Sequence, residues 1–315
     1  MSIQAALESS TFQFYMALIL GILVFAGLIL LLMKFVLKKN VTSIWHTYRG
    51  WLIMIPLAMG AVFLGREATV VGITLLSIMG FKEFAKATGI YKDWWLTGGV
   101  YLTIVVIGIL AIWPTSPEGH PGLFGLFRVI PVFGIAFLLL VPIIRDRTKG
   151  QLQWVSLSIV GYVYIGWMFG HLSFLADAAN AYGYVLYLLL AVEVNDVAAF
   201  TFGKLFGKHK FRPNISPNKT WEGFFGALGV SLALPWLLGF SLPEFGALEK
   251  ILTGLIIGIG GQMGDLSISV IKRDLDIKDM GAIIPGHGGI LDRIDSLIYT
   301  APLFLHMIHF FHGLW

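Results

Sequence analysis

Long apolar runs dominate this sequence and restrict it to one class of fold. The first run reaches from Phe12 to Phe35, and similar runs recur along the whole chain. A helix needs about 20 consecutive apolar residues to cross the hydrocarbon core of a bilayer. Hydrophobic residues make up 57% of the 315 and charged residues only 13%, more apolar surface than one water-soluble core needs. We therefore expect an all-α polytopic integral membrane protein.

The apolar runs predict about ten transmembrane helices. We place them near residues 12–35, 50–65, 68–82, 94–113, 125–144, 153–175, 182–203, 221–241, 251–271 and 294–313. The first run is too long for a cleaved signal peptide and lacks its basic leader, so we interpret it as a retained span. The second and third runs are short, and are also compatible with a re-entrant hairpin tipped by Arg66 and Glu67. Both alternatives return the chain to the same side of the membrane.

Basic residues alternate between rich and poor loops. All but three of the 22 lysines and arginines fall in one set of loops, and the exceptions are Arg66, Arg128 and Lys250. The side richer in Lys and Arg normally faces the cytoplasm. This pattern places both termini on the non-cytoplasmic side and the long loops 204–220 and 272–293 in the cytoplasm. We expect a multi-pass protein of a bacterial cytoplasmic (inner) membrane.

The polar residues divide the chain into two regions. Residues 1–150 are expected to be N-terminal transmembrane helices, and residues 151–315 a C-terminal transmembrane region that carries both long cytoplasmic loops. The sequence has no cysteine, which excludes disulfides, thiolate metal sites and cysteine nucleophiles. Function is therefore expected on the cytoplasmic face, between residues 193 and 296.

Two carboxylates interrupt the seventh apolar run. Glu193 and Asp196 are three residues apart, which places them on one face of a helix. Ionised groups at membrane depth are costly and usually face a cavity, a partner or an ion. The alternative is that this pair caps or salt-bridges a helix near the interface, close to Lys204.

The first cytoplasmic loop combines basic residues with small and turn-forming ones. Its basic residues are Lys204, Lys208, Lys210, Arg212 and Lys219. Ser216 or Thr220 can cap the helix that follows the loop. A cap explains the helix start but not the basic residues, whose composition suits phosphate binding at a helix N-terminus. Simple positive-inside flanking is the alternative, and the spacing alone leaves both open.

The second cytoplasmic loop lies between carboxylates of two helices. Asp265 lies deep in an apolar run, while Asp292 and Asp295 are three apart and share a helix face. If these three side chains meet across a crevice, their oxygens suit Mg²⁺, which is usually held by one or two carboxylates plus substrate phosphates. The alternatives are an N-cap role for Asp292 and a salt bridge from Asp295 to Arg293 or Arg273.

Glycines precede the last of these helices in the segment PGHGG, residues 285–289. Glycine lets backbone amides approach an anion closely, and the following helix N-terminus favours that anion. His287 in this segment is either part of an anion site or a loop histidine with no special role.

Residues 269–295, SVIKRDLDIKDMGAIIPGHGGILDRID, resemble the signature of the phosphatidate cytidylyltransferases (CDP-diacylglycerol synthases) with its spacing intact. The segment SPNKTWEG at 216–223, and Asp196 ahead of FGKLFG at 202–207, resemble other blocks of that family. The resemblance covers roughly residues 190–300. The N-terminal half resembles the family only in being a set of membrane helices.

The resemblance implies a magnesium-dependent step of phospholipid biosynthesis. A cytidylyl group would pass from CTP to phosphatidate, giving CDP-diacylglycerol and pyrophosphate. The expected metal ligands are Asp265 and Asp292, with a second cation left open, and the expected catalytic residues are these two and Lys219. The other residues expected to bind substrate are Asp196, Lys204, Ser216, Lys272, Arg273, Lys278, His287, Gly288, Gly289, Arg293 and Asp295. The expected partners are CTP, a lipid phosphate, membrane lipids and a second copy of the chain, with no nucleic acid.

Two departures from the family pattern concern the acceptor. Many members have a glutamate three positions after the deep aspartate, where this chain has Ile268. Asn195 and Val197 flank Asp196 in place of the usual small residue and Ser or Thr, and Glu193 is an extra carboxylate. These departures are compatible with a rearranged site or with a divergent paralogue that acts on another lipid phosphate.

Alternative functions remain at this point. The wider superfamily also resembles CDP-archaeol-type synthases and lipid-alcohol kinases, and the acceptor is a phosphatidate, isoprenoid or archaeal-type lipid. An ion-coupled transporter would instead use Glu193, Asp196 and Asp265 as a proton or cation path. The many basic and glycine residues on one cytoplasmic face favour the enzyme.

Overall fold

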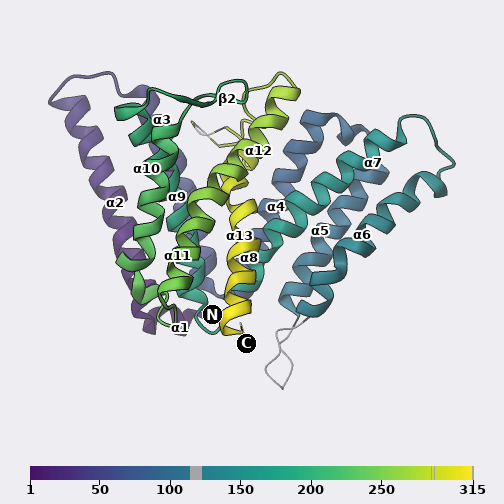
Figure 1. Ribbon diagram of the computed structural model, residues 1–315, viewed down its shortest axis with the longest axis horizontal. Helices are drawn as coiled ribbons and strands as arrows, with labels where there is room; N and C mark the ends of the chain where they lie inside the picture. Colours follow the sequence, from purple (N-terminus) through teal and green to yellow (C-terminus); the bar gives the residue numbers. More distant parts are fainter. Residues whose placement is uncertain (114–122, 285, 287, 314–315) are drawn as a thin grey trace.

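Long helices cross the protein in alternating directions (Figure 1). The computed structural model describes residues 1–113, 123–284, 286 and 288–313. Within these residues, nine helices are long and apolar enough to cross a membrane. The prediction of an all-α polytopic membrane protein is confirmed.

Two of the N-terminal helices are longer than predicted. They are α1 (Ile3–Glu8), α2 (Ser10–Phe35), α3 (Thr42–Leu64), α4 (Arg66–Thr88), the 3-10 turn η1 (Ile90–Lys92), α5 (Trp94–Ile112) and α6 (Phe124–Ile144). The predicted spans 50–65 and 68–82 were too short, because α3 and α4 each have 23 residues. Polar residues occupy the ends that were missed. Two helices of this length favour full crossings over a re-entrant hairpin.

The C-terminal helices include two that are interrupted by π-helical turns. They are α7 (Gln151–Val160), η2 (Gly161–Met168), α8 (Phe169–Leu175), α9 (Ala181–Phe206), α10 (Trp221–Leu237), η3 (Gly239–Ser241), α11 (Ala247–Leu255), η4 (Ile256–Gly260), α12 (Gly261–Asp274) and α13 (Leu291–His312). The π-helical η2 and η4 join their neighbours into the continuous segments 151–175 and 247–274. The predicted span 221–241 is instead the 17-residue α10 followed by the 3-10 turn η3.

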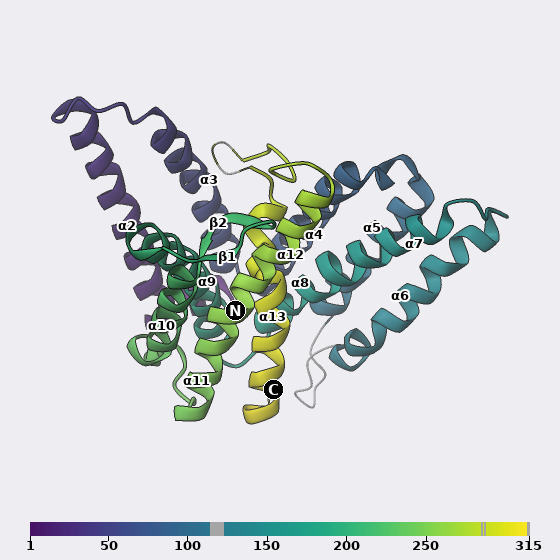
Figure 2. The same ribbon diagram turned by 45° about the horizontal axis from the view of Figure 1, so that its top comes forward.

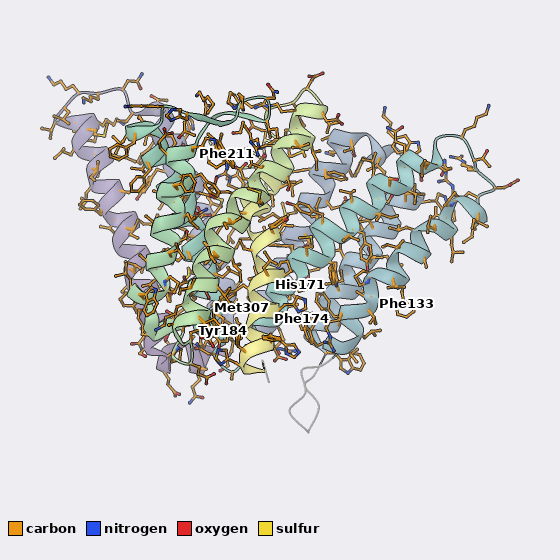
Figure 3. All side chains as sticks on the ribbon, in the orientation of Figure 1. Phe133, His171, Phe174, Tyr184, Phe211 and Met307 are labelled. Atoms are coloured by element: carbon orange, nitrogen blue, oxygen red, sulfur yellow. The ribbon has the colours of Figure 1, made fainter. Side chains whose placement is uncertain are left out.

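A small hairpin occupies the loop between α9 and α10. Its strands are β1 (Lys210–Arg212) and β2 (Ser216–Thr220), which pair antiparallel. The hydroxyl of Thr220 accepts a hydrogen bond from the amide of Gly223 at 3.2 Å and so caps α10. Phe211 of β1, labelled in Figure 3, is buried and packs edge-on against Trp221, which anchors the hairpin on the start of α10. Of the two predicted caps, Thr220 is confirmed, whereas Ser216 begins β2.

The hairpin and the loop between α12 and α13 lie at one end of the molecule, and both termini lie at the other (Figures 1 and 2). This arrangement requires an even number of crossings, and the 17-residue α10, which is long enough to cross a bilayer, supplies the crossing beyond the nine. The assignment of the termini to the non-cytoplasmic side stays a prediction from the distribution of lysine and arginine.

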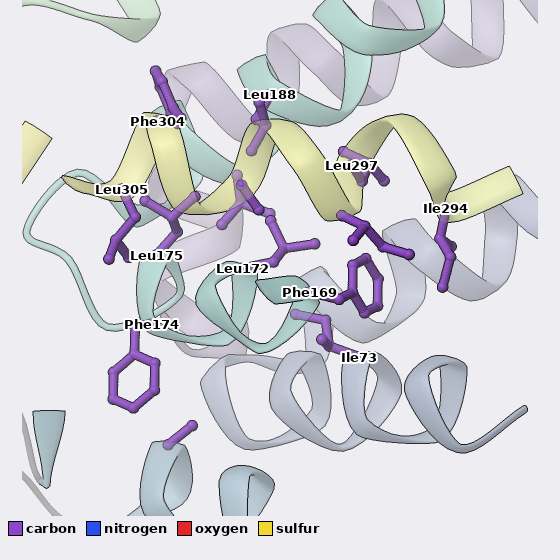
Figure 4. Close-up of a cluster of buried hydrophobic side chains, with 14 of the residues drawn as sticks. Ile73, Phe169, Leu172, Phe174, Leu175, Leu188, Ile294, Leu297, Phe304 and Leu305 are labelled. Carbon is purple, nitrogen blue, oxygen red and sulfur yellow. The ribbon is translucent and has the colours of Figure 1, made fainter. Parts of the chain in front are cut away.

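Helix α13 is the central element of the core. Its apolar face packs on α8, α9 and α4, and the shared cluster includes Ile73, Phe169, Leu172, Leu175, Leu188, Ile294, Leu297, Phe304 and Leu305 (Figure 4). By contrast, α2 leaves residues such as Phe25 (67%) and Leu28 (58%) exposed, as expected for contact with lipid. Burying α13 fixes the position of the carboxylates near its N-terminus.

An ion pair joins the start of α5 to the end of α6. Asp93 caps α5, and its Oδ2 lies 2.6 Å from Arg145 Nη1. Burial raises the pKa of Asp93, but hydrogen bonds from Arg145 and from the amide of Leu96 outweigh burial, so the net pKa is lowered.

We predict that Phe304→Ala lowers the thermal unfolding midpoint of the protein in detergent, because Phe304 is fully buried. In water-soluble cores such a truncation costs about 3–5 kcal/mol. Phe310→Ala on the same helix is the matched control, since Phe310 is 81% exposed. Equal shifts of the midpoint in the two variants would contradict the core described for α13.

Candidate active site

Five carboxylates from three helices form one electrostatic cluster close to the hairpin and the loop. Asp295 interacts electrostatically with Asp265 and Asp196, and Asp196 interacts with Glu193. Asp292 joins them through Lys272, which interacts with Asp265 and Asp295 as well. We call Glu193, Asp196, Asp265, Asp292 and Asp295 the acidic cluster. The structure thus brings together carboxylates of α9, α12 and α13 that are up to about 100 residues apart in sequence.

A backbone contact between α12 and α13 places Asp265 beside Asp295. A side chain at Gly264 would collide with the carbonyl of Asp295 and would come within 2.8 Å of the Ser296 Cα. The Ser296 hydroxyl donates to the carbonyl of Gly261 at 3.1 Å. Small residues allow this close approach between membrane helices. Gly264 is therefore required by packing rather than by backbone dihedral angles.

Lys219 connects the hairpin to α12. Its Nζ lies 2.7 Å from Asp265 Oδ2 and 2.6 Å from Gln262 Oε1. The other oxygen of Asp265 accepts a hydrogen bond from the Ser269 hydroxyl at 3.1 Å. Gln262 is 2% exposed, and its Nε2 has no hydrogen-bond partner among the described residues. Lys219 and Asp265 therefore form an ion pair at the edge of the cluster, and the phosphate and metal roles expected of them stay predictions.

Asp292 organises the loop that precedes α13. Its Oδ1 lies 2.8 Å from Lys272 Nζ, and its Oδ2 accepts hydrogen bonds from the amides of Met280 (2.9 Å) and Gly289 (3.0 Å). Asp292 itself is 7% exposed. The N-cap residue of α13 is Ile290, so the alternative in which Asp292 caps this helix is wrong.

The salt bridge suggested for Asp295 is not formed in the described part of the chain. Asp295 Oδ1 accepts a hydrogen bond from the amide of Ser296 at 2.7 Å, and Asp295 is 6% exposed. Arg273 Nε donates instead to the carbonyl of Ile215 at 3.1 Å, which joins the second loop to the hairpin. Asp295 is therefore a buried member of the acidic cluster.

The glycine segment adopts conformations that favour glycine. Gly286 and Gly288 have φ angles of +74° and +82°, and the amide of Ile284 donates to the carbonyl of Gly288 at 3.0 Å. The amide of Gly289 points to Asp292, so it is engaged by the chain's own carboxylate. The predicted role of His287 concerns a residue outside the described part.

The remaining basic residues predicted to bind substrate are exposed, and only Arg293 among them interacts with the cluster in the described part of the chain. Arg293 is exposed and interacts electrostatically with Glu193 and Asp196. Lys204 is exposed and lies over the ring of Phe200, 5.7 Å from its centroid. Lys278 and Arg273 are also exposed, and Ser216 pairs with Arg212 in the hairpin. Lys219 and Lys272 are thus the predicted lysines that the structure brings into contact with the carboxylates.

The two positions that depart from the family pattern, Ile268 and Glu193, have different surroundings. Ile268 is fully buried in the hydrophobic core, so an apolar side chain fills this position. Glu193 is half-buried and adds a carboxylate on the α9 side of the cluster.

The sequence reasoning missed Gln262 and Glu83. Gln262 lies three residues before Asp265, on the same helix face, which is the signal that could have identified it. Glu83 of α4 is 4% exposed, and its Oε2 accepts a hydrogen bond from the amide of Leu291 at 2.9 Å. The predicted span 68–82 ended one residue before it. The division of the chain at residue 150 stays a prediction, although Glu83 shows that the N-terminal region contacts the site.

The donor set suits a hard cation only in part. Among the described residues, no three carboxylate or imidazole side chains are grouped so that they could hold a metal ion together. Asp265 and Asp292 each have a lysine ammonium within 2.8 Å, so a metal ion at either carboxylate would have to replace that ammonium. Their donor type, carboxylate oxygen, fits Mg²⁺ that takes further ligands from phosphates and water, and the two side chains do not form a closed protein cage.

Comparisons with known proteins cover most of the chain. The sequence model of the cytidylyltransferase family matches residues 45–311. The uncharacterized protein YnbB of Escherichia coli (strain K12) is 35% identical over 250 residues, which are 78% of this chain and 80% of that protein.

Two similar proteins are named phosphatidate cytidylyltransferase. The one from Staphylococcus haemolyticus (strain JCSC1435) is 38% identical over 173 residues, 55% of this chain and 66% of that protein. The one from Staphylococcus aureus (strain COL) is 46% identical over 149 residues, 47% of this chain and 55% of that protein. The matched regions therefore span just under two thirds and a little over half of these two relatives.

We predict that Gly264→Ala lowers the thermal unfolding midpoint and the activity together, because the new methyl group separates α12 from α13. Gly229→Ala on α10 is the control, since a methyl group there meets nothing within 4 Å among the described residues. A midpoint and an activity like those of the unmodified protein in Gly264→Ala would contradict the backbone contact.

Proposed function

The chain belongs to the cytidylyltransferase family, and from this premise we propose that it transfers CMP from CTP to phosphatidate. The products are CDP-diacylglycerol and pyrophosphate, and the chain is a membrane-bound nucleotidyltransferase of phospholipid biosynthesis. The observation that carries the proposal is the pairing of Lys219 with Asp265 and of Lys272 with Asp292 in one partly buried cluster.

The reaction needs positioned charges rather than a protein nucleophile. A phosphate oxygen of the lipid attacks the α-phosphorus of CTP, the bond to the β-phosphate breaks, and pyrophosphate leaves with its electron pair. Holding both substrates in line removes much of the barrier, and cations stabilise the charge that develops on the transferred and leaving phosphates. The chain has no cysteine, and this route requires none.

The two lysines have partners that substrates can replace. Lys219 and Lys272 bind carboxylates at 2.7 and 2.8 Å, and a phosphate offers the same kind of charged oxygen. We propose that both ammonium groups move from the carboxylates to CTP or lipid phosphates. Each exchange would leave Asp265 and Asp292 able to accept another cation.

Asp265 and Asp292 would hold Mg²⁺ between the protein and the phosphates. Asp196 and Asp295 support this region of negative charge from α9 and α13. Bound magnesium would neutralise charge on the reacting phosphates and orient them. The interaction of Lys272 with both Asp265 and Asp292 supports one shared position for a cation.

The acceptor is the least constrained part of the proposal. YnbB matches 78% of this chain, a larger share than either phosphatidate cytidylyltransferase does. Ile268 also departs from the family pattern. YnbB is uncharacterized, so Ile268 is the observation that supports a second candidate, a cytidylyltransferase acting on another lipid phosphate. Family membership favours both enzymes over an ion-coupled transporter. A homodimer stays a prediction.

The first test is pyrophosphate release by the purified protein in detergent with CTP and Mg²⁺. We expect release that depends on added phosphatidate, because the lipid phosphate is the nucleophile, and a CDP-lipid in the organic extract. Isoprenoid and archaeal-type lipid phosphates form the parallel arms. Release with one of those lipids alone would identify the second candidate, and no release with any lipid would contradict cytidylyl transfer.

We further predict that Asp265→Asn and Asp292→Asn each lower the turnover number roughly 100-fold or more, the scale of losing one charge-stabilising group. Each replacement removes a negative charge that holds the cation, while the amide keeps the shape of the side chain. Glu67→Gln is the matched control, because Glu67 is 68% exposed at the opposite end of the molecule. Turnover within twofold of the unmodified protein in both Asp variants, with unchanged thermal midpoints, would refute the metal assignment.

A further inference from the structure

Glu83 is a buried carboxylate that reaches the loop before α13 from the N-terminal region. It lies on α4, is 4% exposed, and its Oε2 accepts a hydrogen bond from the amide of Leu291 at 2.9 Å. Leu291 is the first residue of α13, and the N-cap residue Ile290 makes no side-chain cap hydrogen bond. Helix N-termini leave their first amides without intrahelical partners. Glu83 therefore supplies from another helix the acceptor that a local cap would provide.

Two glycines enclose the Glu83 carboxylate. A side chain at Gly281 would collide with Oε1, and one at Gly289 would lie 2.5 Å from Oε2. At Gly281 the three nearest atoms all belong to Glu83, whereas a Cβ at Gly289 would also lie 2.7 Å from the backbone nitrogen of Gly281. The close fit indicates that these glycines accommodate the chain's own carboxylate, one on each oxygen.

The loop segment held by Glu83 is the segment that holds Asp292. The amides of Gly289 and of Met280, the residue before Gly281, both donate to Asp292 Oδ2. Glu83 and Asp292 thus contact the same two stretches of the loop, at residues 280–281 and 289–291. A shift of Glu83 would move the donors that orient Asp292.

A contribution to stability alone does not explain why the Glu83 carboxylate is buried. Oε1 of Glu83 is buried and has no hydrogen-bond partner among the described residues. A buried polar atom without a partner is destabilising, and each such group requires an explanation.

We propose that Glu83 is a positioning residue for the transfer reaction, fixing Met280, Gly281 and residues 288–292 so that Asp292 Oδ1 faces Lys272 and the reacting phosphates. This inference rests on the proposed function for its catalytic consequence. It makes α4 part of the reaction machinery, although the sequence motifs of the site all lie after residue 190.

The test compares Glu83→Ala and Glu83→Gln with the control Glu67→Ala on the same helix. Glu83→Ala should lower kcat roughly 10- to 100-fold, the scale of a small misplacement of reacting groups, with KM for CTP changed less than threefold. Glu83→Gln should keep most of kcat, because its amide oxygen still accepts from Leu291. A kcat within twofold of the unmodified protein in Glu83→Ala, or an equal loss in Glu83→Gln, would overturn the proposal.

Hydrogen–deuterium exchange of the segment 280–292 provides a readout independent of activity. Exchange should rise there in Glu83→Ala and not in Glu83→Gln, with the rest of the protein unchanged. If the unmodified protein shows no activity with any lipid phosphate, the proposed function fails while this measurement still tests the positioning role. Unchanged exchange in Glu83→Ala would overturn it.

A double variant of Glu83 and Gly281 tests the contact between these two residues even if one replacement disturbs folding. Gly281→Ala should impair the protein when Glu83 is present, because the methyl group collides with Oε1. In the Glu83→Ala background the same change should add little, which is the non-additivity expected of residues in contact. Fully additive effects on kcat and on deuterium exchange would contradict the enclosure of Glu83 by this glycine.

Discussion

The contact between α12 and α13 is the constraint on which the site depends. Gly264 allows the backbone of α12 to touch the backbone of α13 at Asp295 and Ser296. In a membrane, helix association relies on such close packing because lipid competes equally for apolar surface. The contact brings Asp265 beside Asp295, and the burial of the apolar face of α13 keeps it there.

Placing so many carboxylates together inside a helical bundle requires compensating cations. Asp265 and Asp292 each have a lysine partner, and Asp292 has two backbone amides besides. Asp295 is instead buried among other acids. A cluster of this kind is poor for stability but well suited to bind cations and phosphates, because new partners can relieve the repulsion. The geometry therefore connects the acidic cluster to the chemistry proposed for it.

Much of this arrangement could be predicted from the sequence, because it depends on local patterns. Apolar runs of membrane length identified most helices, and the spacing of Asp292 and Asp295 placed both on one helix face. Other features depend on tertiary contacts. The hairpin produces no periodic pattern in the sequence, and neither does the contact of Lys204 with Phe200 on its own helix. Glu83 has the sequence pattern of a charge at the membrane surface, and only the packing of α4 against the loop shows its role. The ends of α3 and α4 were missed because interfacial turns are polar.

The most direct test of the account follows each phosphate of CTP during the reaction with the lipid. Purified protein is incubated with Mg²⁺, phosphatidate and CTP labelled at either the α- or the γ-phosphorus, and the label is then partitioned between water and organic solvent. The account predicts that the α-label enters the lipid fraction while the γ-label stays in water as pyrophosphate. Transfer of the γ-label to a lipid would instead show kinase chemistry, and retention of both labels in water with every lipid phosphate would contradict cytidylyl transfer.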